Sequence, residues 1–431
     1  MELKSGYKQT EVGLIPQAWE VKRLGDLFNF SGGYSASRDQ LSNEGHCYLH
    51  YGDIHGATKT FVDVRADYQD IPKLNIHLKQ VSSKSMLEDG DVVFVDASED
   101  DEGTSRHVVV VNRDNIPFIS GLHTIVAKSK TAELAHEYRR YCFQTSAIRQ
   151  QFLFYAVGTK VSGISKTNIA KLTMPVPKIP EQRAIAEALS DVDALLGALE
   201  HLIAKKRDLK QAATQQLLTG QTRLPGFYGE WEETTLGQIG ECIIGLTYKP
   251  ENVVEYGLLV LRSSNVQNAQ LAYDDNVYVN FEVPEHLVTR PGDILICVRN
   301  GSRALIGKCA MIDEAAAGVT FGAFMSVYRT KHSRFIFHAF QAYDIQRQIY
   351  ENIGATINQI TNKDMNAFRV KLPTVPEQNA IAEVLSDMDA ELAALEQRRA
   401  KTRALKQGMM QELLTGRTRL VESGKLRVDN Q

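Results

Sequence analysis

The sequence lacks the features of a membrane protein or a secreted protein. No apolar run approaches the roughly 20 residues of a membrane-spanning helix, and the polar opening segment has no apolar signal core. Cysteine is scarce, and the five residues Cys47, Cys142, Cys242, Cys297 and Cys309 include no Cys-x-x-Cys pair. This pattern argues against both a disulfide framework and a zinc knuckle. We therefore expect a cytoplasmic protein with no membrane partner.

An excess of positive charge is also absent. The 431 residues include 49 basic and 52 acidic side chains, which gives a net charge of −3. Residues 1–177 carry 20 basic and 21 acidic side chains, and residues 225–373 carry 13 and 16. Because a DNA-binding protein is expected to present a basic surface, this balance counts against nucleic acid. Any DNA-binding face must arise by local clustering, or partner subunits must neutralise part of the phosphate charge.

The chain does contain a long internal repeat. The stretch IAEALSDVDA from Ile185 returns as IAEVLSDMDA from Ile381, and QQLLTGQTRL from Gln215 returns as QELLTGRTRL from Gln411, both 196 positions later. Near the start the offset is 212, so the first diverged segment carries sixteen extra residues. A period near 200 far exceeds the roughly 20 to 50 residues of a solenoid unit. The pattern indicates duplication of a whole domain together with its connector.

The repeated connector has the pattern of a helix. Apolar residues recur every three or four positions, Glu181 and Glu377 lie in the expected first turns, and Leu-Leu-Thr-Gly ends each pattern. About 37 residues at ~1.5 Å each make a rod of about 55 Å. We expect the two rods to pack as an antiparallel, coiled-coil-like spacer. The alternative is that each helix only caps its own domain.

The diverged segments favour an α+β fold. Strands are predicted at DVVFV from Asp91, HVVVV from His107, DILICV from Asp293 and FMSVYR from Phe324, with turns at Gly90 and Gly292. Short helices are expected over 132–152 and 335–351. The predicted organisation is two similar mixed α/β domains, 1–177 and 221–373, separated by spacer helices at 178–220 and 374–420, with a polar tail at 421–431.

The loop RNGSRALIGK from Arg299 is the most informative candidate site. It gathers arginine, asparagine and serine around glycines, and these groups suit base edges and phosphate. It does not fit a nucleotide-binding loop, because five residues separate Gly301 from Gly307 and Cys309 stands where Ser or Thr would hold magnesium. A solvated hairpin is the alternative.

Further candidate loops lie at 31–38, 51–56, 158–165, 245–250, 262–266 and 354–361. Equivalent loops with unlike side chains would recognise unlike half-sites. The candidate DNA-binding residues of the first domain are Tyr34, Arg38, Asp53, Ser98 and Lys160. Those of the second are Tyr248, Lys249, Ser264, Asn265, Arg299, Asn300, Ser302, Arg303 and Asn358.

Two clusters suggest a metal ion, and each has a simpler explanation. His46, Cys47, His50, Asp53 and His55 include good zinc ligands, but in a strand their side chains would alternate between faces. The acidic run from Asp96 to Glu102 could coordinate magnesium, form a solvated loop, or accept a bond from a cytosine amino group. We predict no metal site and no catalytic residue. Trp19 and Trp231 are expected to anchor the cores.

Taken together, YKxTEVGLIPxxWEVKRLGDL near the start and the paired IPEQRAIAEALSDVDALL and VPEQNAIAEVLSDMDAEL segments resemble the specificity subunit of Type I restriction-modification systems. The resemblance covers nearly the whole chain. It implies that each domain recognises one half of a split site in double-stranded DNA, while the helices set the gap and bind two modification subunits. It also implies that two restriction subunits complete an ATP-dependent nuclease.

The resemblance implies that this chain is non-catalytic. No methyltransferase, helicase or complete phosphate-loop motif is present in the sequence. S-adenosylmethionine, ATP and magnesium would therefore belong to the partner subunits. Two other interpretations stay open: a protein scaffold with two adaptor domains, which the acidic balance favours, and a self-sufficient nuclease that uses the acidic run.

Overall fold

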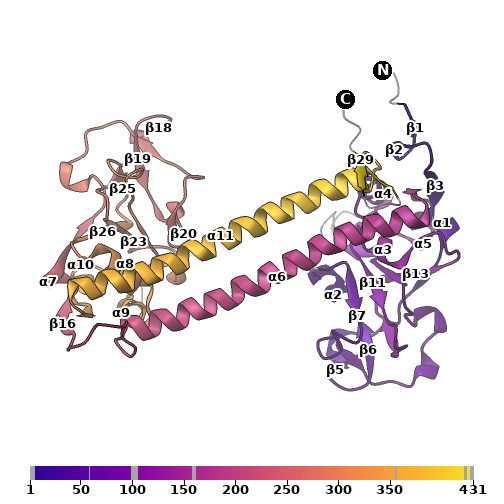
Figure 1. The fold of residues 1–431 in the computed structure, drawn as a ribbon, viewed down its shortest axis with the longest axis horizontal. Coiled ribbons are helices and arrows are strands. Elements are labelled where there is room, and N and C mark those ends of the chain that lie inside the picture. Colours follow the sequence, from indigo (N-terminus) through magenta and orange to yellow (C-terminus); the bar gives the residue numbers. More distant parts are fainter. Residues whose placement is uncertain are drawn as a thin grey trace. The chain divides into compact units, whose positions relative to one another are not determined.

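The computed structural model describes residues 5–57, 59–98, 105–157, 162–354, 357–421 and 425–427. The chain divides into two compact units: unit 1 comprises Met1–Ala198 with Arg399–Gln431, and unit 2 comprises Leu199–Arg398. Each unit therefore contains the beginning of one long helix and the end of the other (Figure 1). Among the described residues, no helix is long and apolar enough to cross a membrane.

Unit 1 is built on two sheets. The larger has the order β4-β13-β9-β11-β7, with bounds β4 (Phe28–Gly32), β13 (Thr124–Ser129), β9 (Val92–Val95), β11 (His107–Val111) and β7 (Phe61–Asp63). The smaller has the order β12-β6-β8-β5, with bounds β12 (Phe118–Ser120), β6 (His46–Leu49), β8 (Lys73–Leu74) and β5 (Leu41–Ser42). Only the pairs β11/β7 and β12/β6 are parallel in these sheets.

Unit 2 repeats this topology with one strand fewer in the larger sheet. Its sheets have the orders β17-β26-β23-β24 and β18-β22-β19-β25. The bounds are β17 (Gly240–Ile244), β26 (Met325–Thr330), β23 (Ile294–Cys297), β24 (Cys309–Met311), β18 (Val253–Val254), β22 (Tyr278–Val279), β19 (Leu258–Leu261) and β25 (Thr320–Phe321). The strand without a counterpart, β7, lies where the first copy carries extra residues.

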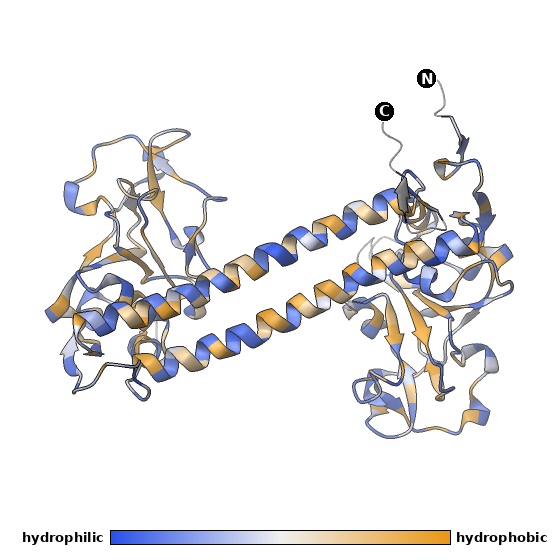
Figure 2. Cartoon of the chain, in the orientation of Figure 1, coloured by the Kyte–Doolittle hydropathy of each residue, from blue (hydrophilic) through white to orange (hydrophobic). Residues whose placement is uncertain are grey.

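The central strands are apolar throughout because both of their faces are buried. In β9, Val92 and Phe94 join the core beneath the helices, while Val93 and Val95 join the core beneath the smaller sheet. The strand β23 alternates in the same way between two cores. Figure 2 shows these strands as apolar ribbons. The strands predicted from the four apolar runs are confirmed.

Each stretch predicted to be helical after the sheet contains two helices. They are α3 (His136–Cys142) and α4 (Ser146–Tyr155) in unit 1, and α8 (Ser333–Gln341) and α9 (Tyr343–Asn352) in unit 2. The first break follows from Thr145, whose side chain accepts a hydrogen bond from the Ile148 amide and so caps a new helix. The second break lies at Ala342, which has extended backbone angles.

Short elements complete both units. Unit 1 also contains β1 (Tyr7–Thr10), β2 (Gly13–Pro16), β3 (Glu20–Arg23), α1 (Leu24–Leu27), α2 (Tyr51–Gly56), β10 (Ala97–Ser98), β14 (Ser162–Gly163), α5 (Lys166–Ile169), β15 (Thr173–Val176), β28 (Arg419–Val421) and β29 (Lys425–Arg427). Unit 2 also contains β16 (Glu232–Thr235), α7 (Leu236–Ile239), β20 (Val266–Gln267), β21 (Gln270–Leu271), α10 (Asn362–Ala367) and β27 (Arg369–Leu372).

The two long helices are α6 (Ile179–Leu218) and α11 (Val375–Leu413), so the helical connectors predicted from the repeat are confirmed. Each ends at the repeated Leu-Leu-Thr-Gly segment. Gly220 and Gly416 have φ angles of +72° and +71°, which favour glycine. A Cβ atom at these positions would lie 3.5 Å from the Trp231 ring and 3.1 Å from the Trp19 ring.

The end of each long helix packs on the domain that precedes the other long helix in the sequence. In unit 1, Leu413 and Leu414 of the α11 segment lie in the same core as Trp19 and Ile185. In unit 2, Leu217 lies in the core that contains Ile381 and Leu385 of α11. The first turns of each helix thus cap their own domain, but the alternative that each helix only caps its own domain is wrong, because its end packs on the other copy.

Ion pairs join the two helices beyond these turns. Lys406 pairs with Asp193 at 2.7 Å in unit 1, and Lys206 pairs with Glu391 at 2.7 Å in unit 2. Further along unit 2, Lys210 pairs with Asp389 and Arg207 with Glu396. Residue numbers rise along one helix as they fall along the other, so the predicted antiparallel arrangement is confirmed.

Candidate nucleic-acid interface

Backbone hydrogen bonds gather several loops at one edge of unit 2. The Gly322 amide donates to the Leu261 carbonyl at 2.9 Å, and the Val298 amide donates to the Phe324 carbonyl at 3.0 Å. The Ile360 amide in turn donates to the Val298 carbonyl at 3.0 Å. The loops that follow β19, β23, β25 and α9 therefore converge. We call this set of loops the loop edge of unit 2.

Unit 1 builds the same edge with equivalent bonds. The Gly121 amide donates to the Leu49 carbonyl at 2.9 Å, and the Asp96 amide donates to the His123 carbonyl at 3.1 Å. The Ile164 amide donates to the Asp96 carbonyl at 2.8 Å. The duplication therefore preserves backbone geometry while the side chains differ. The two loop edges therefore present different side chains on the same backbone arrangement.

Hydrogen bonds of Asn300 and Asn358 hold the loop 299–303 of unit 2 in one conformation. The Asn300 amide donates to the Asn358 carbonyl at 3.2 Å, and the Asn358 side chain donates to the Gly301 carbonyl at 2.9 Å. The Asn300 side chain donates to the Ser263 hydroxyl at 3.1 Å and accepts a bond from the Ser302 amide at 3.0 Å. These bonds fix the loop before any ligand arrives.

Two arginines of this loop rest on aromatic rings. The Arg299 guanidinium lies 4.9 Å from the ring centroid of Phe324, and the Arg303 guanidinium lies 4.3 Å from that of Tyr350. Arg303 also donates to the Tyr350 carbonyl at 3.0 Å. Both rings are exposed, at 55% for Phe324 and 63% for Tyr350. Planar cations and rings thus share one exposed surface.

The corresponding edge of unit 1 has different side chains. Arg38 pairs with Asp53 at 2.7 Å, and the Asp53 carboxylate also accepts a bond from the His50 amide at 3.3 Å. His123, with φ +57°, lies 3.3 Å from the Asp96 carboxylate and packs edge-on against Tyr51 at 5.5 Å. This edge therefore combines a carboxylate-bound arginine with imidazole and phenol groups.

Comparison with known proteins agrees with this two-domain architecture. The family model described as "Type I restriction modification DNA specificity domain" matches residues 16–207 and again residues 228–403. The chain belongs to this family. The two matches correspond to the two copies of the repeat.

Relatives of similar length share this assignment. The chain is 22% identical over 437 residues to the Type I restriction enzyme MjaVIII specificity subunit of Methanocaldococcus jannaschii, covering 97% of both chains. It is 30% identical over 186 residues to the EcoKI specificity subunit of Escherichia coli, covering 39% of each. The crystal structure of the Type I S subunit from M. genitalium matches with a TM-score of 0.58 and 16% identity, over 96% of this chain and 98% of that one. The predicted family resemblance is confirmed, and the chain is a Type I specificity subunit.

Within this specificity subunit, several predicted base-reading residues lie on the loop edges. Arg299, Ser302 and Arg303 are exposed, and Asn358 is partly buried beside them. Lys249 is exposed and lies next to Glu251, whereas Tyr248 packs partly against the core beneath the smaller sheet. Lys160 lies outside the described residues. That these side chains bind bases stays a prediction.

Other predicted residues are turned inward. Asn265 is fully buried, accepts a bond from the Arg262 amide at 2.9 Å, and donates to the Ala272 carbonyl at 2.9 Å. The Ser264 hydroxyl is also buried, and Ser98 is 6% exposed in β10. Tyr34 packs partly against a small core. In this arrangement Asn265 shapes its loop, because its hydrogen-bonding groups are used within the unit.

Sequence reasoning missed the aromatic residues of the loop edges. Phe324 and His123 are equivalent, since both follow the Gly322 or Gly121 turn and accept the same backbone bond. Tyr350 corresponds to Leu153, because the equivalent helices α4 and α9 begin at Ser146 and Tyr343; Leu153 is 48% exposed. Alignment of the two copies could have indicated the Phe324 and His123 position, but it gives no signal for Tyr350, because the equivalent residue of the first copy is a leucine.

The acidic and basic loops are equivalent parts of the two copies. The register pairs Phe94 with His107 in unit 1 and Ile296 with Cys309 in unit 2, at a constant offset of 202. The segment 98–106 therefore corresponds to 300–308. Residues 99–102 of the acidic run lie outside the described residues. At the level of sequence, the first copy carries Asp101 where the second carries Arg303.

The structure shows no clustering of the candidate zinc ligands. Cys47 is buried in β6, and the His50 side chain accepts a bond from the Gly52 amide at the start of α2. His46 and Cys47 alternate between the faces of β6, as expected for a strand. Within the described residues, no group of three or more His, Cys, Asp or Glu side chains could hold a metal ion.

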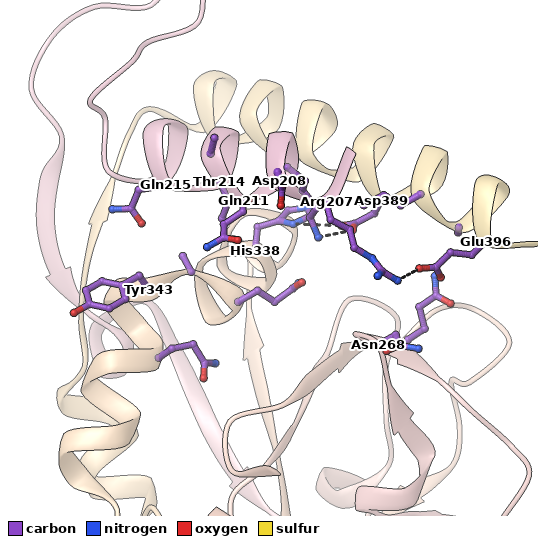
Figure 3. A pocket seen from close by; sticks show the side chains of 18 residues that line it. Arg207, Asp208, Gln211, Thr214, Gln215, Asn268, His338, Tyr343, Asp389 and Glu396 are labelled. Atoms are coloured by element: carbon purple, nitrogen blue, oxygen red, sulfur yellow. Dashed lines mark hydrogen bonds and ion pairs between the residues drawn. The ribbon is translucent and has the colours of Figure 1, made fainter. Parts of the chain in front are cut away.

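A groove in unit 2 is lined by the long helices α6 and α11, by α8 and α9, and by the turn between β20 and β21. It has a volume of about 1060 Å³ and is lined mainly by polar side chains, among them Gln211, Gln215 and Glu396 (Figure 3). At its base the His338 imidazole lies 3.1 Å from the Ser386 hydroxyl and 3.9 Å from the Asp389 carboxylate. Asp389 also pairs with Lys210. We call this group the helix joint of unit 2.

Unit 1 has the same joint with tyrosine in place of histidine. The Tyr141 hydroxyl lies 3.0 Å from the Ser190 hydroxyl and donates to the Asp193 carboxylate at 2.9 Å. Lys406 pairs with Asp193 at 2.7 Å. Each joint therefore connects a domain helix, the beginning of one long helix and the end of the other. It is a structural connection that the duplication has preserved.

Proposed function

We propose that each loop edge of this specificity subunit recognises one half of a split DNA site. The observation that carries the proposal is that both units build the same edge with equivalent backbone hydrogen bonds but present unlike side chains. Base edges in the major groove differ in their donors and acceptors, so unlike side chains select unlike sequences. Double-stranded DNA is therefore the ligand of both units.

We further propose that the paired helices α6 and α11 set the gap between the half-sites and bind two modification subunits. Two restriction subunits would complete the enzyme. A solved structure that concerns complex assembly of the Type I system matches this chain with a TM-score of 0.55 and 17% identity. In this proposal S-adenosylmethionine, ATP and magnesium are bound by the partners, the chain performs no reaction, and the complex works in the cytoplasm.

The decisive experiment expresses this chain with its neighbouring modification subunit in a host that lacks adenine methylation. Single-molecule sequencing of the host DNA then reports every methylated adenine. We expect one split motif with a methylated adenine in each half and an unspecified gap of fixed length. An assembled complex that yields no motif would contradict the proposal.

A binding assay separates DNA recognition from the protein-scaffold interpretation. Phosphate contacts release counterions, so the affinity of the complex for duplex DNA should fall steeply between about 50 and 200 mM salt. A scaffold for protein partners would show no specific duplex binding. The same assay with the isolated chain and magnesium should show no cleavage; cleavage would favour the nuclease interpretation of the acidic run.

A further inference from the structure

The two arginines of the loop 299–303 have aromatic rings as their side-chain partners. Among the described residues, no carboxylate lies within ion-pair distance of Arg299 or Arg303, and the only side-chain partner near each guanidinium is a ring. In unit 1, by contrast, Arg38 pairs with Asp53. Two uncompensated charges thus remain on one loop of a chain whose net charge is −3.

The rings also restrict how these charges are oriented. A guanidinium that lies over a ring exposes its N–H edge sideways while its face is covered. Arg303 is restrained further by its bond to the Tyr350 carbonyl, and the loop beneath it is fixed by Asn300 and Asn358. The arginine side chains therefore lose little conformational entropy when the paired N–H groups of a guanidinium, its fork, bind a planar acceptor.

The planar acceptor that fits this fork in duplex DNA is guanine. Its O6 and N7 atoms accept two parallel hydrogen bonds from one arginine, which is the commonest specific contact in the major groove. Phosphate is the other possible partner. Binding phosphate does not require an oriented guanidinium, however, because lysine also binds phosphate as a point charge. Two preoriented forks on one loop favour base recognition.

We propose that the half-site recognised by unit 2 contains at least two G·C pairs, read by Arg299 and Arg303 and positioned by Phe324 and Tyr350. The inference rests on the proposed function, since it assigns base chemistry to one of the two loop edges. Phe324 and Tyr350 are positioning residues: they hold the guanidinium groups and need not touch the bases. Among the described residues of the unit 1 loop edge no arginine lies over a ring, so the inference is confined to unit 2.

The test compares methylation motifs of single variants in complex with the modification subunit. Arg299→Ala and Arg303→Ala should each relax one G·C position in the same half-site and leave the other half unchanged. Tyr350→Leu and Phe324→Leu should relax the same positions, whereas Tyr350→Phe and Phe324→Tyr, which keep a ring, should retain the wild-type motif. Phe154→Leu, which removes an exposed aromatic ring from the corresponding helix α4 of unit 1, should leave this half-site unchanged.

A binding measurement makes the test independent of methylation activity. In duplexes that carry the wild-type site, 7-deazaguanine removes the N7 acceptor of one guanine at a time. The wild-type complex should bind such a duplex about tenfold more weakly, in line with the ~1 to 3 kcal/mol of a bidentate contact. The matching arginine variant should not distinguish the two duplexes.

The outcomes separate this inference from the function on which it rests. A split motif whose unit 2 half holds only A·T pairs overturns the inference and leaves the proposed function intact. The inference is also overturned if the Leu variants keep the full motif. Absence of any split motif from the assembled wild-type complex overturns the proposed function itself.

Discussion

At the scale of single residues, the repeated Pro-Glu-Gln segment explains how each long helix is anchored. The Glu377 carboxylate is 1% exposed and accepts a bond from Arg223 at 2.6 Å, while Arg223 lies over the Trp231 ring. In unit 1 Glu181 accepts bonds from Arg419 at 2.8 Å and from the Trp19 indole at 2.9 Å. One carboxylate therefore connects the start of one helix to the segment that follows the other.

Replacing Glu377 with Ala should destabilise unit 2. The substitution removes a buried carboxylate together with the bonds that it accepts from Arg223, and because a hydrogen bond to a charged group contributes about 1.5 to 3 kcal/mol, we expect a loss of about 2 kcal/mol in the free energy of unfolding. The chain has two tryptophans, so urea unfolding can be followed by Trp231 fluorescence in a Trp19→Phe background. Glu233→Ala, which breaks an exposed pair with Arg369, serves as the control and should cost less than about 1 kcal/mol. Equal losses would contradict the anchoring role.

The helix joint of unit 2 should make this unit sensitive to acid. Burial, the main cause, lowers the pKa of His338 from 6.5 to about 4. Below pH 6.5 the unfolded chain binds a proton that the folded unit does not, so stability falls as the pH drops from about 6.5 to about 4, by roughly 3 kcal/mol in all. His338→Tyr reproduces the joint of unit 1 and should remove this component.

The measurement is the urea midpoint of unit 2, followed by Trp231 fluorescence between pH 7.5 and 4.5. Unit 1, followed by Trp19, is the internal control: it keeps its own acid sensitivity, because burial lowers the pKa of His107 to about 4. If the midpoint of the His338→Tyr variant falls as steeply with acid as that of the wild type, the joint is not the cause.

Sequence alone predicted polar loop residues but not their orientation. Asn265 and Asn300 are chemically identical candidates, yet one is fully buried and the other is partly buried beside exposed arginines. Likewise, Arg303 and Tyr350 are 47 residues apart. Such pairings depend on which loops converge, and convergence is set by tertiary hydrogen bonds that no local pattern records.

At the scale of elements, the long helices were the most predictable part of the fold. Their apolar spacing, first-turn glutamates and terminal Leu-Leu-Thr-Gly are local signals, and the observed helices end close to the predicted stops. The breaks at Thr145 and Ala342 were missed because the flanking segments share one apolar periodicity. The short strands of the smaller sheets, such as β8 and β22, are two residues long and carry no periodicity to detect.

The helices should act as the ruler of the split site. Four residues inserted after Ala198 and four after Arg398 would lengthen both helices by about 6 Å. At ~3.4 Å per base pair we expect the unspecified gap to grow by one or two base pairs, as measured by methylation sequencing. Insertion into one helix alone cannot keep both Lys406 with Asp193 in unit 1 and Lys206 with Glu391 in unit 2 in register, and should abolish the motif. An unchanged gap after the double insertion would show that the helices do not set the spacing.

At the scale of the whole molecule, neither copy of the repeat forms a unit by itself. Unit 1 needs Arg399–Gln431, which lie beyond the second copy of the domain, and unit 2 needs the second half of α6. The core of unit 1 includes Leu413 and Leu414 together with Trp19. Duplication thus produced two units that are each closed by the chain of the other copy.

Ending the chain after Arg398 should therefore damage the distant unit more than the adjacent one. Unit 1 loses core leucines and the Arg419 partner of Glu181, whereas the residues of unit 2 are all retained. We expect Trp19 fluorescence to report unfolding at much lower urea concentration, with little change in the signal of Trp231. A selective loss of unit 2 would contradict the division of the chain into these units.

The exchange of helix ends also constrains how such a chain can arise. Arg223 and Arg419 are equivalent residues, as are Glu181 and Glu377, so the first copy already carries both halves of the anchoring pair. A half-length chain of one domain and one helix could satisfy both anchors by swapping its helix with a second identical chain. After fusion of two such genes, each domain could diverge while the anchors stay fixed. The two half-sites would then no longer have to be identical in sequence. A symmetric ancestor would in this way give rise to an asymmetric recognition site.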